Sequence, residues 1–351
     1  MIDLTTTYMG LALKNPLVVA SSGLTGSVAG VKRCAEAGAA AVVLKSLFEE
    51  QILAQTQALA AYADEAAHGE AAEYLHGYGR ELGPRTYLQL VEEAKRAVDV
   101  PIIASLNCHS ASSWVDYARK LEAAGADAIE LNLALMPVAQ AQPAAAVEEL
   151  YLRIVHEVKA RVAIPVAVKV GPYFSSFAHV AKKLCADVME GPGFSVGWCG
   201  PGPTEKNLRW RGADALVLFN RFYQLDIDIH QLKLVAGNPY SSSAEIHTPL
   251  RWVSLLAGRI DAELAATTGV HDGRDAIKQL LAGAQVVQLC STLYLHGLGR
   301  IGEILRELSL WMQTQGFTRL ADFRGRLSQA QSPEPEDHER WQYVKLFVGL
   351  E

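Results

Sequence analysis

The chain has 351 residues, 50% of them hydrophobic, and a formal net charge of −6 at pH 7. This length can bury a large core in one or two domains, and the mild negative charge excludes the basic surface of a nucleic-acid-binding or membrane-binding protein. The five cysteines form no CxxC pair, which argues against a zinc site or an iron–sulfur cluster and fits a reducing compartment.

The chain begins MIDLTTTYMG, which has neither the basic region nor the apolar region of a signal peptide. No apolar run along the chain reaches the ~18 residues of a membrane span. We therefore expect a cytoplasmic protein that acts on a small molecule and contacts neither nucleic acid nor membrane.

Short apolar segments recur along the whole chain. Several follow an amphipathic stretch and a Gly-Ala turn, as in EAGAAAVVL, EAAGADAIEL and LAGAQVVQL, the pattern of a helix that ends at glycine before a buried strand. Continuous apolar strands are typical of a parallel sheet covered on both faces. We count eight: Leu17–Ala20, Ala41–Leu44, Ile102–Leu106, Ala128–Leu131, Val166–Val170, Ala215–Phe219, Glu263–Thr267 and Val286–Leu289.

Eight strands that alternate with helices predict an α/β fold of the (β/α)8 TIM-barrel type, one domain over 1–330. A doubly wound open sheet is the alternative, but no GxGxxG follows the first strand. A barrel carries its active site at the carboxyl ends of its strands. The polar residues there include Lys45, Asn107, Asn132, Lys169 and Asn220.

Lysines that converge in a barrel mouth should face a ligand anion or a reacting group, because a buried lysine without a partner is costly. The alternative is that Lys45 and Lys169 pair with carboxylates and that each asparagine caps a loop. The last two strands are followed by TTGVHDG and CSTLYLHG. Small and hydroxylated residues after strands 7 and 8 predict the phosphate-binding loops of this fold.

Two segments fall outside the barrel pattern. The stretch 187–210, DVMEGPGFSVGWCGPGPTEKNLRW, interrupts a helix-to-strand connection, and removing it restores the helix, turn and strand pattern. We interpret it as an insertion between strands 5 and 6, on the face opposite the active site. Residues 331–351 form a polar linker followed by the apolar WQYVKLFVGL, which predicts a tail that docks on the barrel or a partner.

Several of these motifs, in this order, resemble the dihydroorotate dehydrogenases, in particular their soluble class 1 branch of FMN-dependent barrels. The resemblance covers most of the chain and rests on NPLVVASSG (15–23), AVVLKS (41–46), IELNL (129–133), VAVKVGPYF (166–174), LVLFN (216–220), TTGVHDGRDAIKQLLAGAQVVQLCSTLY (267–294) and GFTRLADFRGRL (316–327).

The resemblance implies an FMN site and assigns its residues. The flavin loop after the first strand is Ala20, Ser21, Ser22 and Gly23, followed by Lys45, Ser46, Asn107, Asn132, Lys169 and Asn220 at later strand ends. The phosphate-binding positions are Ser243, Thr268, Gly269, Cys290 and Ser291. Thr268 stands where the family has glycine, and Ala244 replaces another glycine, so the backbone donors survive only if the local φ allows a side chain.

The segment ELNLALMP, 130–137, departs from the family most clearly. The family has its catalytic base, Cys or Ser, at the position of Leu135, and a substrate-binding Asn at the position of Pro137. A leucine accepts no proton, and a general base contributes roughly 10²–10⁴-fold to such a reaction. Lys45, Asn132, Lys169 and His76 are the catalytic candidates, and Tyr78 and His109 are alternatives for the missing base.

The resemblance therefore predicts an FMN oxidoreductase that transfers hydride from a dihydropyrimidine-like substrate to flavin. It also implies a homodimer and an electron-transfer partner. Two other classes stay open. One is a Schiff-base aldolase or lyase in which Lys169 or Lys45 is the nucleophile, and the other is a flavin-binding scaffold without dehydrogenase activity. No cluster of His, Asp and Glu predicts a metal.

Overall fold

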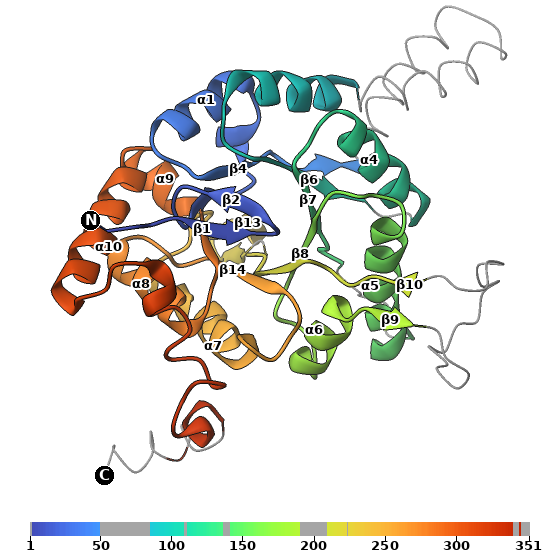
Figure 1. Ribbon diagram of the computed structural model, residues 1–351. Helices are drawn as coiled ribbons and strands as arrows, with labels where there is room; N and C mark the ends of the chain where they lie inside the picture. The colour runs from blue at the N-terminus through green and yellow to red at the C-terminus, as the bar shows by residue number, and fades with distance from the viewer. Residues whose placement is uncertain are drawn as a thin grey trace, which may run out of the picture.

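The computed structural model describes residues 2–49, 85–108, 111–135, 141–189, 209–222, 224–339 and 344. A closed parallel barrel forms its centre (Figure 1). The barrel strands are β3 (Leu17–Val19), β4 (Ala41–Val43), β6 (Ile102–Asn107), β7 (Ala128–Asn132), β8 (Val166–Val170), β11 (Ala215–Leu218), β14 (Glu263–Thr267) and β15 (Val286–Leu289). Pairing of β4 with β6 closes the ring, and β5 (Leu47–Phe48), which follows β4 in the chain, pairs parallel with the carboxyl end of β6. The predicted TIM barrel is confirmed.

Helices surround the barrel, as Figure 1 shows. They are α1 (Val28–Glu36), helical residues 85–97, α4 (Ala111–Ala123), α5 (Ala144–Lys159), α6 (Phe177–Cys185), α7 (His247–Leu256), α8 (Gly273–Ala282), α9 (Ser291–His296) and α10 (Arg300–Gln315). Short 3-10 helices lie at η1 (Gly23–Thr25), η2 (Ser243–Ile246), η3 (Leu320–Asp322) and η4 (Pro335–His338). No described helix is long and apolar enough to cross a membrane.

The Gly-Ala turns end their helices in the predicted way. Gly38, Gly125 and Gly283 have φ of 107°, 89° and 119°, in the left-handed region that glycine adopts without strain. The alanine after each glycine donates its N–H to a carbonyl five residues back in the helix, over 3.1, 3.2 and 2.9 Å. These bonds fix the angle at which each strand leaves its helix.

A hydrogen bond between an alanine N–H and a helix carbonyl also joins the two ends of the segment between α6 and β11. Ala213 donates its N–H to Leu184 O over 2.8 Å, although 28 residues separate the two in the sequence. Beyond this joint, β9 (Val188–Met189) pairs antiparallel with β10 (Arg209–Trp210). The intervening residues 190–208 lie outside the described part of the chain. The exact limits of the insertion, 187–210, and the separate tail, 331–351, stay predictions.

The barrel interior changes from apolar to polar toward the mouth. At the closed end, the hairpin of β1 (Thr6–Tyr8) and β2 (Leu11–Leu13) packs its buried residues against small inward-facing side chains of the strands (Figure 1). Along β7 the inward positions then read Ala128, Glu130 and Asn132, while Ile129 and Leu131 face the helices. Because side chains of a strand alternate between its two sides, Glu130 and Asn132 both point into the barrel, and Asn132 lies nearer the mouth.

A second hairpin leaves the mouth after β11. It consists of β12 (Leu225–Asp228) and β13 (Lys233–Ala236), paired antiparallel. Gly237 donates its N–H to Gln224 O over 2.8 Å and closes the base of the hairpin. The chain then returns to the barrel at η2 and α7.

Candidate active site

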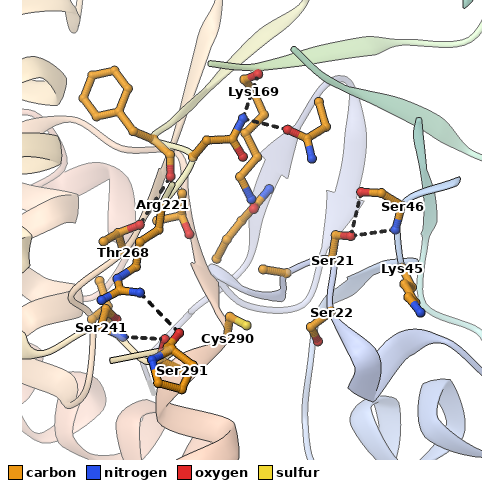
Figure 2. Close-up of a pocket in the computed structure, with 18 of the residues that line it drawn as sticks. Ser21, Ser22, Lys45, Ser46, Lys169, Arg221, Ser241, Thr268, Cys290 and Ser291 are labelled. Atoms are coloured by element: carbon orange, nitrogen blue, oxygen red, sulfur yellow. Dashed lines mark hydrogen bonds between the residues drawn. The ribbon is translucent and has the colours of Figure 1, made fainter. Parts of the chain in front are cut away.

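A pocket of about 370 Å³ opens at the carboxyl ends of the barrel strands. This volume is in the range of small-molecule sites, roughly 300–1,000 Å³. Figure 2 shows Ser21, Ser46 and Lys45 on one side and Thr268 and Ser241 on the other. Most residues predicted for the site line this pocket: Ala20, Ser21, Ser22, Gly23, Lys45, Ser46, Asn132, Lys169, Asn220, Thr268, Gly269, Cys290 and Ser291.

Lys169 rises from the barrel interior into the pocket and pairs with a buried carboxylate. Its Nζ lies 3.7 Å from Glu130 Oε1, and only 1% of the Glu130 side chain is exposed. Gln288 donates its Nε2–H to Glu130 Oε2 over 2.7 Å. Within the described residues, Glu130 Oε1 accepts no hydrogen bond. In the described part of the chain Lys169 Nζ makes this one loose ion pair and donates no hydrogen bond, so its N–H groups are available to a ligand.

The three predicted asparagines form one connected group. Asn220 donates its Nδ2–H to Asn132 Oδ1 over 2.6 Å, and Asn107 donates its own to the backbone oxygen of Asn132 over 3.0 Å. Asn107 does not line the pocket, and it supports the pocket by holding the backbone of Asn132. The bond from Asn220 orients the Asn132 amide, and within the described residues the Nδ2 of Asn132 donates no hydrogen bond and can serve a ligand.

A chain of hydroxyl groups runs from the opposite wall into the core. Ser21 Oγ accepts the backbone N–H of Ser46 over 2.9 Å and lies 3.1 Å from Ser46 Oγ. Ser46 Oγ lies 2.7 Å from the buried Ser105 Oγ. Tyr87 donates its hydroxyl to Ser105 O over 3.1 Å, and burial raises the pKa of this tyrosine. The chain holds Ser21 and Ser46 rigidly at the pocket wall.

The loop after β14 keeps a left-handed backbone at both predicted positions. Thr268 has φ 75° and Gly269 has φ 77°. A Cβ at Gly269 would lie 2.3 Å from Ile246 N, so only glycine allows this close approach of the two loops. Thr268 donates its hydroxyl to Phe219 O over 3.3 Å. The loop is therefore left-handed at position 268 although a threonine, and not a glycine, stands there.

The strain at Thr268 can be measured by comparing two variants that both lose its hydroxyl. We expect Thr268→Gly to be more stable than Thr268→Ala by about 1 kcal/mol, because an L-residue in the left-handed region costs roughly 1–2 kcal/mol. Chemical denaturation of the ligand-free variants gives the difference. An alanine variant as stable as the glycine variant would mean that this loop is not left-handed in solution.

The structure places Ser241 in the pocket wall, and it does not place Ser243 there. Ser241 donates its N–H to Ser291 Oγ over 2.9 Å, and its Oγ accepts the N–H of Gly269 over 3.3 Å. Ser243 donates its hydroxyl to Asp275 Oδ2, beside the start of α8. The sequence offers three consecutive serines, 241–243, and only the fold distinguishes them.

Arg221 also lines the pocket and was not expected from the sequence. Its guanidinium donates to Glu245 Oε2 over 2.8 Å and to the backbone oxygens of Asn238 and Pro239 over 3.0 and 3.2 Å. Burial opposes the ionisation of Glu245, but the hydrogen bonds from Arg221 and Ser242 prevail and lower its pKa. Arg221 therefore fixes the loop that carries Ser241.

The described pocket wall suits a negatively charged ligand. It contains the cations Lys45, Lys169 and Arg221 and no carboxylate. Cys290 also lines it, and burial raises the pKa of the thiol despite the opposing effects of Lys169 and Ser22, so the thiol is neutral at pH 7. The described residues contain no group of three or more His, Cys, Asp or Glu that could hold a metal.

The proposed substrate side of the site is only partly described. His76, Tyr78, His109 and Pro137 lie outside the described residues. Leu135 is described, half-buried, and packs against the core between barrel and helices. It does not line the pocket.

Comparison with known proteins points to one family. The family model for dihydroorotate dehydrogenase matches residues 3–190. The catalytic subunit of dihydroorotate dehydrogenase B (NAD(+)) from Thermoplasma volcanium is 30% identical over 332 residues, 93% of this chain and 98% of that protein. The protein of the same name from Thermoplasma acidophilum is 27% identical over 338 residues, 93% of this chain and 99% of that protein.

Proposed function

The chain belongs to the dihydroorotate dehydrogenase family, and from this membership and the pocket we propose that it is an FMN-dependent oxidoreductase acting on a dihydropyrimidine-like substrate. The observation that supports this most directly is the described pocket wall, which contains three cations and no carboxylate. Beside it, the left-handed loop at Thr268 and Gly269 lies close to the backbone of Ile246. Such a wall complements a ligand with a phosphate and a planar ring that becomes anionic on reduction.

We expect the described residues to hold FMN in three places. Thr268, Gly269 and Ser291, with Ser241 behind them, would hold the phosphate. The loop 20–23 and Ser46 would lie along the ring. Lys169 would place positive charge at the edge of the ring.

Bound FMN would supply the hydride acceptor. Lys169 would stabilise the negative charge that reduction adds, and Lys45, which is exposed, would orient the ring or the substrate. Asn132, fixed by Asn107 and Asn220, would donate its amide N–H to the substrate. Leu135 cannot accept the proton that leaves the substrate carbon. Another group must accept it, and His76 is our candidate.

An anaerobic absorbance titration tests this proposal. We expect the purified protein to carry a flavin band that dithionite bleaches and that dihydroorotate bleaches slowly, because the family's base is missing. A flavin band that dihydroorotate leaves unchanged would mean that the cofactor is bound but that the substrate is another compound. A protein that neither contains nor binds FMN would contradict the proposal, and trapping of a carbonyl substrate by borohydride on Lys169 or Lys45 would then support the Schiff-base alternative.

The relatives named above are catalytic subunits, so their names imply a further chain in those proteins. We extend this to an electron-transfer partner for the present chain. Co-purification of a flavin- or iron-containing protein with the tagged chain would test it. Isolation of the chain alone, with rapid reoxidation by a small soluble acceptor, would argue against it.

A further inference from the structure

His271 lies behind the pocket wall, against a serine that the wall presents to a ligand. Its Nε2 is 3.3 Å from Ser241 Oγ. Ser241 lines the pocket, whereas His271 lies outside the pocket wall. Figure 2 shows Ser241 beside Ser291, whose Oγ accepts the Ser241 N–H. The hydrogen bond between His271 and Ser241 thus connects the imidazole to the pocket.

The backbone of His271 is held from three sides. Its N–H donates to Asp275 Oδ2 over 3.1 Å, and its carbonyl oxygen accepts the Nε–H of Arg300 over 2.9 Å and the hydroxyl of Thr292 over 3.2 Å. Asp275, Thr292 and Arg300 belong to α8, α9 and α10. Three helices therefore fix the place from which the imidazole meets Ser241.

The Ser241 hydroxyl has one proton to donate and two lone pairs. One lone pair accepts the N–H of Gly269 over 3.3 Å. When Nε2 of His271 carries a proton, it can donate to the second lone pair, and the Ser241 O–H is then left to donate into the pocket. When Nε2 is bare, Ser241 donates to His271 and turns a lone pair to the pocket. The proton on Nε2 therefore decides whether Ser241 attracts or repels an anion.

We propose that His271 is a positioning residue for a phosphate group: its Nε2–H directs the Ser241 hydroxyl at a phosphate bound beside Gly269 and Ser291. The identity of this group as the phosphate of FMN rests on the proposed function, whereas the hydrogen-bond argument rests on the residues alone. A protonated imidazole also attracts the anion, so phosphate binding should take up a proton.

The charges around the imidazole support this coupling. The charged and titratable groups near it come from four elements: Asp272 and Asp275 at the start of α8, His296 of α9, Arg300 of α10 and Glu245 of η2. Burial lowers the pKa of His271, and this effect prevails although the two aspartates and the Ser241 backbone raise it. The ligand-free imidazole is therefore mostly neutral at pH 7, and a bound phosphate should raise its pKa.

Binding of FMN to the full chain freed of flavin, measured by flavin fluorescence, tests the proposal. His271→Gln keeps a donor in place of Nε2 but does not titrate, and His271→Leu has no donor. We expect His271→Leu to bind FMN about tenfold more weakly than His271→Gln, at about pH 5.5 and at about pH 8. The wild type should match His271→Gln at the lower pH and bind FMN more weakly than it at the higher pH.

Two controls accompany this comparison. Riboflavin, which lacks the phosphate, should bind the wild type and both His271 variants equally, and His296→Gln, at an exposed neighbouring position, should bind FMN as the wild type does. The titration of the FMN phosphate itself is common to all variants and cancels at each pH. Equal FMN affinity of His271→Leu and His271→Gln, or the same loss with riboflavin, would contradict the proposal.

A second measurement does not depend on FMN. Nuclear magnetic resonance of the histidine rings, with the His271 signal assigned from its absence in His271→Gln, follows the pKa of His271 in the full chain. Inorganic phosphate should raise this pKa more than chloride of equal ionic strength does, and should change that of His296 less. No rise at His271 would overturn the proposal. A rise in a chain that binds no FMN would uphold it and count against the proposed function instead.

Discussion

Lys169→Met is expected to lower the free energy of unfolding by about 3–5 kcal/mol, because it leaves Glu130 as a buried charge without its cation. The double variant Lys169→Met/Glu130→Gln should recover most of this loss, since the uncompensated charge is then gone. Urea denaturation of the two single variants, the double variant and the wild type measures the coupling.

Lys45→Met is the matched control for this cycle. Lys45 lines the same pocket but is exposed, and we expect its substitution to change stability by less than about 0.5 kcal/mol. Both lysine variants should bind an anionic ligand more weakly, so ligand affinity alone would not separate them. Equal destabilisation by the two substitutions, or a double variant no more stable than Lys169→Met, would disprove the charge argument.

Leu135→Cys should raise the rate of flavin reduction by dihydroorotate by about 10²–10⁴-fold, on the proposal that position 135 supplies the proton acceptor, as the family pattern implies. The leucine itself does not line the pocket, but the position lies three residues beyond Asn132, which does. Stopped-flow absorbance under anaerobic conditions measures this rate. The control Leu135→Ala opens the same half-buried space without a group that accepts a proton. A rate increase shared by both variants would show that space, and not proton transfer, limits the reaction.

The strands were predictable because their apolar runs are continuous. Each predicted strand matches its observed bounds within one residue, and the Gly-Ala turns marked where helices end. The positions of Lys45, Asn132 and Lys169 in the pocket followed from one rule, that strand ends meet at one mouth.

The partners of those residues were harder to predict. Glu130 and Gln288 lie inside strands that are otherwise apolar except for Asn132 at the end of β7, and a fully buried strand does not show by its pattern which side faces inward. Glu130 and Asn132 are two residues apart, so their side chains point to the same side of the strand, and this spacing was the available signal for the inward side. Arg221 and Ser241 depend on how the loop beyond β12–β13 returns to the barrel, which no local pattern specifies.

The joint between Leu184 and Ala213 has a consequence for protein engineering. The hydrogen bond between Leu184 and Ala213 holds the two ends of this segment together. The connection from α6 to β11 is therefore complete without the segment. New chain termini placed within 190–208, with the original ends linked, should give a circular permutant that keeps every barrel strand pairing. The closed end of the barrel thus offers an attachment point for a reporter domain, on the face opposite the pocket.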